Sequence, residues 1–261
     1  MKVPAAEAET ARAVFLDLFP AGFEERDHAD GLELAAYTDV GGVARARSAF
    51  GCVAVSEVAP GWEEGWRAFH RPVRVGPFWI GPPWEPPPED AIALVIEPAR
   101  AFGTGGHPTT RLCLELLSDL RAEFRAAALL DLGCGSGVLA VAAARLGYRP
   151  VRAMDVDGVA VEETRRNTEA NAVAVQVSLG DALVDELPRT DVAVANITLE
   201  AIEALAPRLR CRLLVASGYL GDAGPPGLGG YRHVRRRTAD GWAADLYVRD
   251  GLSAQNRPSR V

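Results

Sequence analysis

The chain has 261 residues and a formal charge of −7, from 28 Lys and Arg against 35 Asp and Glu. Hydrophobic residues make up 48% and charged residues 24%, which is ordinary for a globular protein and argues against general disorder. The acidic balance argues against a protein whose main role is to grip nucleic-acid phosphates, although it leaves room for a local basic patch. The length suits one large domain, or a catalytic domain with a small one.

Motif and spacing argue against several further classes of protein. No apolar run approaches the roughly 20 residues that a membrane helix needs, and residues 1–10 lack the pattern of a secretory signal. The four cysteines lie far apart with no Cys-x-x-Cys pair, which argues against a zinc site and a disulfide framework. We therefore expect a cytoplasmic protein with no metal, no membrane association and no stable nucleic-acid partner, and we expect a monomer.

Residues 1–58 are predicted to form a small α+β domain. Its elements follow the order helix, strand, strand, helix, strand, at residues 7–19, 22–26, 32–38, 43–50 and 52–58. This order is most of a ferredoxin-like module whose first strand is clipped or very short.

Residues 59–90 are predicted to be a linker helix followed by a proline-rich connector. Trp62 and Trp66 lie at helical spacing, which is typical of a helix that packs its aromatic side chains on a neighbour. Six of the chain's 18 prolines lie between residues 77 and 88. Because proline fixes φ and has no N–H to donate, we expect an extended connector there, not a central strand.

From residue 91 to residue 251, predicted strands alternate with helices, which indicates a parallel sheet wrapped by helices. The strands are expected at 127–132, 151–154, 173–179, 191–195 and 212–217, with helices at 138–146, 157–172 and 199–208. Asp240-Gly241 between two further strands predicts a closing antiparallel hairpin. Residues 252–261 are expected to be a disordered tail.

The sharpest local motif is the glycine loop after the first of these strands, Asp131-Leu-Gly-Cys-Gly-Ser-Gly137. Gly133 and Gly135 let the backbone turn tightly and approach a ligand closely, and the following helix offers free N–H groups. The dinucleotide-binding fingerprint would place glycine at 138, which is Val138 here. The Gly-x-Gly-x-Gly form is instead common in S-adenosylmethionine-dependent methyltransferases.

Polar residues also end the next three strands, where ligands bind in an open parallel sheet. Asp155 lies 22 residues beyond Gly133, where its carboxylate can accept both ribose hydroxyl protons. Asp181 could lie near an adenine amino group, and Asn196 ends the fourth strand. A helix cap, an ordinary turn and a buried asparagine are the alternatives for the three positions.

A second glycine-rich stretch precedes the sheet: Glu97-Pro98, then Phe102-Gly103-Thr104-Gly105, then His107-Pro108-Thr109-Thr110. These pieces resemble the characteristic loop of the PrmA-type methyltransferases of ribosomal protein L11. The resemblance continues through residues 131–137, 154–157 and 194–197, and includes the tryptophan linker and the N-terminal module. It therefore covers nearly the whole chain.

This resemblance implies an α/β fold of the class I S-adenosylmethionine-dependent methyltransferases, with a substrate-recognition domain on a linker. It implies S-adenosylmethionine as the methyl donor and a large-subunit ribosomal protein as the acceptor, methylated on lysine side chains or its N-terminal amine. By position, it implies that Thr110, Gly133, Asp155 and Asn196 contact the donor, with Phe102 close to them. Gly135 and Asp181 join this set from the glycine motif and the third strand end.

The chain departs from the family in its second half and at its start. Residues 218–230 contain too many glycines and prolines for the helix that the family has after the fifth strand. The first strand of the N-terminal module is short, and Asn196 is followed by Ile-Thr-Leu. These departures leave the donor site intact and bear on the acceptor.

For the chemistry, we expect Asn196 to orient the attacking nitrogen through its side-chain or backbone oxygen. His107 is a candidate base, with packing of its loop as the alternative. An acidic cluster in the N-terminal module could attract a lysine-bearing substrate, or serve only as solvated charge. Its members are Glu24, Glu25, Asp27, Asp30 and Glu33.

Three other functions remain open from the sequence. The first is a related methyltransferase that acts on lysines of another protein. The second is a nucleic-acid or small-molecule methyltransferase, disfavoured because nucleic-acid amino methyltransferases typically have Asn/Asp-Pro-Pro-aromatic where this chain has Asn196-Ile-Thr. The third is a nucleotide-binding module without catalysis.

Overall fold

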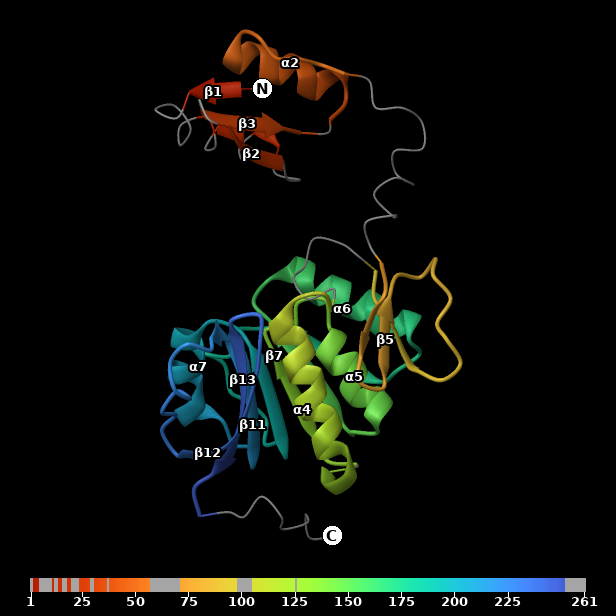
Figure 1. Cartoon of the computed structure of the whole chain (residues 1–261), viewed down its shortest axis with the longest axis vertical. Helices are drawn as coiled ribbons and strands as arrows, with labels where there is room; N and C mark the ends of the chain where they lie inside the picture. The colour runs from red at the N-terminus through yellow and green to blue at the C-terminus, as the bar shows by residue number, and fades with distance from the viewer. Residues whose placement is uncertain are drawn as a thin grey trace. The chain divides into compact units, whose positions relative to one another are not determined.

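The structure is a computed structural model that describes residues 2–4, 11, 14–15, 18–19, 24–28, 31–36, 38–56, 71–97, 105–124 and 126–251. The chain divides into two compact units, residues 1–65 and 66–261 (Figure 1). Among the helices of the described residues, none combines the length and the apolar character needed to cross a membrane.

The first unit contains a three-stranded antiparallel sheet in the order β1-β3-β2. Its elements are β1 (Lys2–Pro4), β2 (Glu24–His28), β3 (Gly31–Ala35) and α2 (Val40–Phe50). The side chain of Asp39 caps α2 by accepting from the N–H of Gly42 at 2.7 Å. A small core lies between the sheet and the helices, formed by Ala11, Phe15, Phe19, Leu32, Leu34 and Ala46.

Three strands of the expected ferredoxin-like module are therefore present, and the short first strand is β1. The strand expected at 52–58 is not formed over residues 52–56, and residues 57–58 lie outside the described part. The order β1-β3-β2 is that of the corresponding strands in such a module. The ferredoxin-like assignment remains a prediction, because the fourth strand is the one that would complete it.

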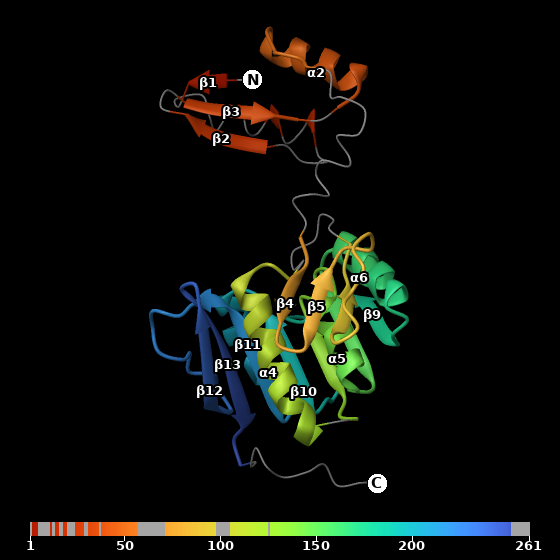
Figure 2. The ribbon, with the colours of Figure 1, turned by 45° about the vertical axis from the view of Figure 1, so that its right-hand side comes forward.

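A second three-stranded sheet, β4-β5-β6, belongs to the larger unit (Figure 2). Its strands are β4 (Val73–Val75), β5 (Phe78–Gly81) and β6 (Ile92–Val95). The expectation of a strandless connector over 76–90 is thus wrong for residues 78–81, which form the central strand. This run contains no proline, so its N–H groups are free to pair, and the prolines at 82–88 follow it.

The main sheet has seven strands in the order β12-β13-β11-β10-β7-β8-β9. All neighbours are parallel except β13, which is antiparallel to both β11 and β12. The strands are β7 (Leu129–Leu132), β8 (Val151–Asp155), β9 (Val175–Leu179), β10 (Val192–Asn196), β11 (Leu213–Leu220), β12 (Tyr231–Ala239) and β13 (Trp242–Arg249). The predicted parallel sheet with a closing hairpin is confirmed, with its turn at Asp240-Gly241.

Helices cover both faces of this sheet. They are α4 (Pro108–Phe124), α5 (Val138–Leu146), α6 (Gly158–Ala170), α7 (Leu199–Leu205) and a 3₁₀ turn, η2 (Ala206–Arg208). Alternate residues of the strands enter two different cores, one shared with α4 and α5 and the other with α7, so these helices lie on opposite faces. Phe78 and Ile80 of β5 enter the first core, which fixes the small sheet to this unit.

Ion pairs hold α4 against the hairpin. Arg111 pairs with Asp240 in the hairpin turn, at 2.9 Å. Further along α4, Asp119 accepts from both Arg235 and Arg237 of β12, each at 2.8 Å. Each pair is partly exposed and adds little stability by itself, but together they set the register between the helix and the hairpin.

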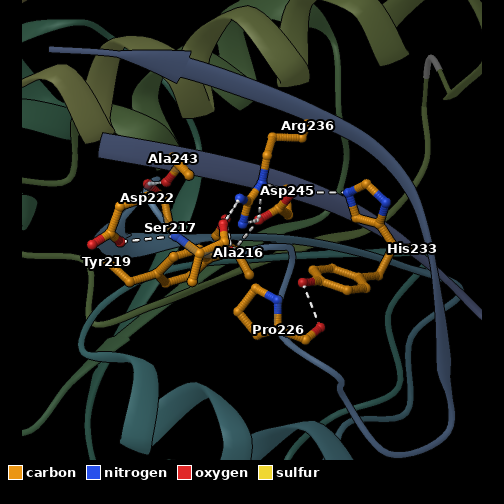
Figure 3. A network of polar contacts seen from close by, with 11 residues as sticks. Ala216, Ser217, Tyr219, Asp222, Pro226, His233, Arg236, Ala243 and Asp245 are labelled. Carbon is orange, nitrogen blue, oxygen red and sulfur yellow. Dashed lines mark hydrogen bonds and ion pairs between the residues drawn. The ribbon is translucent and has the colours of Figure 1, made fainter. Parts of the chain in front are cut away.

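No helix occupies residues 221–230, as expected from their glycines and prolines, and a buried polar network lies beside this loop (Figure 3). Asp245 on β13 is fully buried and accepts from Arg236 at 2.9 Å and from the Tyr219 hydroxyl at 2.8 Å. His233 lies 2.8 Å from the other carboxylate oxygen. The loop joins the network because Arg236 also donates to the carbonyl of Ala223.

Candidate functional site

The glycine loop connects the buried end of β7 to the N-terminus of α5. Gly133, Gly135 and Gly137 all have positive φ, between 54° and 77°, a conformation that side chains other than glycine disfavour. A Cβ on Gly133 would lie 2.4 Å from a side-chain carbon of Ile197. The N–H of Gly133 donates to the carbonyl of Met154 at 2.9 Å, so the loop is fixed to the end of β8.

Asp155 closes β8 directly beside this loop. One carboxylate oxygen accepts from the N–H of Gly135 at 2.9 Å, and the other accepts from the N–H of Asp157 at 3.0 Å. Asp157 caps α6 by accepting from the N–H of Val159 at 2.8 Å. The helix cap, which was the alternative role for Asp155, is therefore supplied by Asp157. The side chain of Asp155 is therefore held in place with acceptor capacity left for a ligand.

Asn196 and Thr110 meet across 86 residues of sequence. Asn196 ends β10, and its side-chain NH₂ group donates to the Thr110 hydroxyl at 3.4 Å. Thr110 lies in the first turn of α4 and is 1% exposed. The start of α4 thus reaches the carboxyl end of the sheet, where the glycine loop also lies.

A single cavity of about 510 Å³ joins these groups. Six of the seven predicted ligand residues line it: Thr110, Gly133, Gly135, Asp155, Asp181 and Asn196. Phe102, the seventh, lies outside the described residues. Part of the apolar lining around these six comes from turns and from α7, and no motif in the sequence predicted it; this part includes Leu183, Ile197, Ala201 and Leu205.

A buried carboxyl lies just before the glycine loop. Asp131 is 1% exposed, and its side chain points to the sheet face that α4 and α5 cover, because Leu130 and Leu132 point to the other. Within the described part of the chain, neither carboxylate oxygen has a hydrogen-bond partner of normal geometry. Burial raises the pKa of Asp131 from 3.8 to about 7, and the negative charge of Asp155 adds to the rise, while the N–H of Ala140 opposes it.

Asn167 of α6 connects the two loop motifs, and no sequence signal pointed to it. Its side-chain oxygen accepts from the N–H of Glu97 at 3.0 Å, and its NH₂ group donates to the carbonyl of Ser136 at 2.8 Å. Glu97 begins the stretch that leads into residues 98–104, and Ser136 belongs to the glycine loop. Asn167 is 3% exposed; its bond to Ser136 is buried and its bond to Glu97 is partly buried.

His107 does not line the cavity. Its Nδ1 lies 2.7 Å from the Thr109 hydroxyl, and its ring packs edge-on against Trp242 with centroids 4.8 Å apart. These contacts favour the packing role over that of a base. Cys134 does line the cavity, and burial raises the pKa of its thiol to about 12, which favours the protonated form at neutral pH.

The acidic cluster of the N-terminal unit lies largely on two neighbouring strands. Glu24, Glu25 and Asp27 belong to β2, and Glu33 belongs to the adjacent β3. Asp30 lies outside the described residues. The described residues contain no group of three or more His, Cys, Asp or Glu arranged to hold a metal ion.

Comparison with known proteins fits this geometry. The model of the family "Ribosomal protein L11 methyltransferase (PrmA)" matches residues 23–224. The chain belongs to this family. A ribosomal protein L11 methyltransferase of Pelobacter propionicus is 43% identical over 207 residues, covering 72% of this chain and 66% of the relative. One of Pseudomonas putida strain W619 is 40% identical over 199 residues, covering 73% and 65%. The chain thus spans just under two thirds of the length of these relatives.

A solved structure supports the fold of this PrmA-family chain. The ribosomal protein L11 methylase of Lactobacillus delbrueckii subsp. bulgaricus superposes with a TM-score of 0.59 at 23% sequence identity. The match covers 69% of this chain and 99% of that one. The predicted α/β class I methyltransferase fold is confirmed by this likeness and by the seven-stranded sheet.

Proposed function

We propose that this chain is an S-adenosylmethionine-dependent protein methyltransferase that N-methylates large-subunit ribosomal protein L11, on lysine side chains, its N-terminal amine, or both. The observation that carries the proposal is the cavity at the carboxyl ends of the parallel strands. Groups from α4 and from the ends of β7, β8 and β10 converge there on one space, in a chain of the PrmA family.

The residues present fit the donor. A volume of about 510 Å³ lies within the range of small-molecule sites. Asp155 has acceptors for ribose hydroxyls, Asp181 lines the same cavity, and the glycines admit close backbone approach. When bound, the donor supplies a methyl group on a sulfonium, whose leaving thioether needs no acid. Phe102 and Thr110 complete the proposed donor contacts.

The remaining task is to position a neutral amine. Lysine side chains and α-amines are mostly protonated at neutral pH, and desolvation in the cavity lowers their pKa. Asn196 offers oxygens that accept from the attacking nitrogen, and its NH₂ group is already directed to Thr110. Correct alignment of nucleophile and methyl group supplies several kcal/mol of catalysis.

Mass spectrometry of purified L11, incubated with the protein and S-adenosylmethionine, tests the acceptor. We expect mass increases in steps of one methyl group, on lysine or the N-terminal amine. A mixture of all ribosomal proteins serves as the control for substrate choice. Methylation of another protein but not of L11 would favour the related lysine methyltransferase, and no methyl transfer to any of them would contradict the proposal.

Calorimetry separates an enzyme from a nucleotide-binding module without catalysis. We expect S-adenosylmethionine to bind and NAD not to bind. Binding of NAD without binding of S-adenosylmethionine would contradict the methyltransferase assignment. The monomeric state, the cytoplasmic location and the lack of a membrane partner remain part of the proposal.

Replacing Asn196 by alanine tests its positioning of the nucleophile. We expect Asn196→Ala to lower single-turnover methylation by about 100-fold, since small misplacements of reacting groups cost this much. Donor affinity, measured by calorimetry, separates a binding defect from a chemical one. Unchanged single-turnover methylation would mean that the side chain does not orient the amine.

Replacing Asn167 by alanine tests the bridge between the two loops. Asn167→Ala removes one buried and one partly buried hydrogen bond and leaves the N–H of Glu97 and the carbonyl of Ser136 without this partner. We expect a loss of about 2 kcal/mol in the free energy of unfolding and a fall of about tenfold in donor affinity. Glu169→Ala, at an exposed site on the same helix, should change neither; equal donor affinity in both variants would contradict the bridging role.

A further inference from the structure

Four arginines line a shallow hollow at one end of the strands of the main sheet, and the donor cavity lies at the other end. The hollow has a volume of about 320 Å³ and is lined by Arg189, Thr190, Arg210, Cys211, Arg212 and Arg249. These residues precede β10 and β11 and end β13, whereas the donor cavity lies at the carboxyl ends of β7, β8 and β10. Neither the glycine loop nor the proposed methyl transfer makes use of this hollow.

The hollow is formed by backbone pairing between neighbouring strands. The N–H of Thr190 donates to the carbonyl of Arg210 at 3.2 Å, and the N–H of Arg249 donates to that of Arg212 at 2.9 Å. The arginines therefore lie at the matching ends of three adjacent strands, just before β10 and β11 and at the end of β13, and neighbouring strands of a sheet are spaced about 4.8 Å apart. This arrangement makes a row of positive charge across that end of the sheet.

Arg249 is held rigidly at one end of the row. Its Nε donates to the carbonyl of Cys211 at 2.9 Å, and one terminal nitrogen, Nη2, donates to the Tyr231 hydroxyl at 3.2 Å. The guanidinium also lies over the Tyr231 ring, 5.0 Å from its centroid. For the other terminal nitrogen, Nη1, the described residues provide no acceptor, so a preorganised donor is left for a ligand.

Two arginines of the row, Arg189 and Arg210, are exposed and carry charge that the lining of the hollow does not balance. No Asp or Glu lines the hollow, and the described residues offer no ion pair to Arg189 or Arg210, which are exposed. The two nearest acids in sequence are engaged elsewhere or lie outside the lining: Asp191 accepts from the N–H of Ala128 at 2.8 Å, and Asp250 follows Arg249. Like charges gathered in this way repel one another, and a bound anion would relieve that repulsion.

We propose that this arginine row binds the phosphate groups of an RNA strand. Guanidinium groups match phosphate oxygens in pairs of parallel hydrogen bonds. An enclosed site for one free phosphate usually contains backbone N–H groups of a nest or a helix N-terminus, whereas here the donors are side chains spread over the ends of three neighbouring strands and the loops that precede them. The overall charge of −7 speaks against extensive nucleic-acid binding, and a local row is compatible with it. The inference is independent of the methyl acceptor.

Fluorescence anisotropy with a labelled oligouridine of about 20 nucleotides tests the proposal on the full chain. At about 50 mM salt, we expect the double variant Arg189→Ala, Arg210→Ala to bind about tenfold more weakly than the wild type. The slope of log K against log salt concentration should fall by about 1.4, which is about 0.7 for each phosphate contact on a single strand. Both side chains are exposed, so the unfolding midpoint should not move.

The matched control is Arg165→Ala, Arg166→Ala, which removes the same charge from exposed positions on α6. It should leave affinity and slope unchanged.

The proposal is overturned if the wild type does not bind RNA, if the two double variants weaken binding equally, or if polyglutamate competes as well as RNA. Competition by inorganic phosphate beyond that of chloride at equal ionic strength would assign a free phosphate instead of RNA. Methylation of isolated L11 should be unaffected by Arg189→Ala, Arg210→Ala, so failure here is distinct from failure of the proposed function.

Discussion

Replacing Asp245 by asparagine should lower the free energy of unfolding of the larger unit by about 3 kcal/mol. The carboxylate is fully buried, and its oxygens accept from Arg236, Tyr219 and His233. Asparagine keeps the volume but removes the charge and replaces one acceptor by a donor, so the Arg236 guanidinium loses its counter-ion. Losing one partner of a buried pair costs more than the pair contributes, because the remaining charge stays desolvated.

Urea unfolding followed by tryptophan fluorescence measures this change, with Asp119→Asn as the control. Asp119 also accepts from two arginines, but it is 33% exposed, and the side chains of Arg235 and Arg237 are exposed to a similar or greater extent. Its removal should cost about 1 kcal/mol or less. If the two variants lost equal stability, the burial of Asp245 would not be what makes its network important. Since Arg236 also holds Ala223, Asp245→Asn should in addition speed proteolysis within residues 221–230.

The parts of this fold that sequence reasoning predicted are those with short-range signals. The glycine loop, the Asp157 cap and the turn at Asp240-Gly241 each depend on a few neighbouring residues, and the structure has all three. The alternation of strands and helices gave the parallel sheet for the same reason. Six of the predicted ligand residues meet in one cavity because parallel strands end at the same edge.

The parts that were missed depend on contacts between distant segments. Strand β5 was overlooked because the surrounding prolines dominate the composition, while Phe78–Gly81 itself pairs with strands on both sides. Asn167 looks like an ordinary helix residue until its partners 70 and 31 positions away are known. The arginine row requires the order β13-β11-β10, which no local pattern specifies.

The second large effect concerns Asp131 and the pH dependence of stability. Because burial raises its pKa from 3.8 to about 7, the folded chain binds more protons than the unfolded chain between these values. The free energy of unfolding contributed by this group therefore falls as pH rises through that window. Asp131→Asn removes the titrating group. Between pH 5 and pH 8, the free energy of unfolding of this variant should therefore fall by about 2 to 3 kcal/mol less than that of the wild type.

Unfolding by urea at several pH values measures this difference. Asp240→Asn, which removes an exposed carboxyl in the hairpin turn, should leave the pH dependence of the wild type in place. Identical pH slopes for Asp131→Asn and the wild type would contradict a raised pKa at position 131. A higher free energy of unfolding for Asp131→Asn than for the wild type at pH 8 would indicate that the carboxyl at this position destabilises the wild-type chain.

Binding of the proposed donor should affect the ionisation of the Asp131 carboxyl. S-adenosylmethionine carries a positive sulfonium and a positive amino group, and a cation near the glycine loop would favour the ionised form of Asp131. By linkage, wild-type donor affinity should then increase as pH rises through about 7, while the affinity of Asp131→Asn should stay level. Calorimetry in buffers of different ionisation enthalpy would detect the proton released on binding. Equal pH dependence of donor affinity in both proteins would mean that Asp131 affects folding alone.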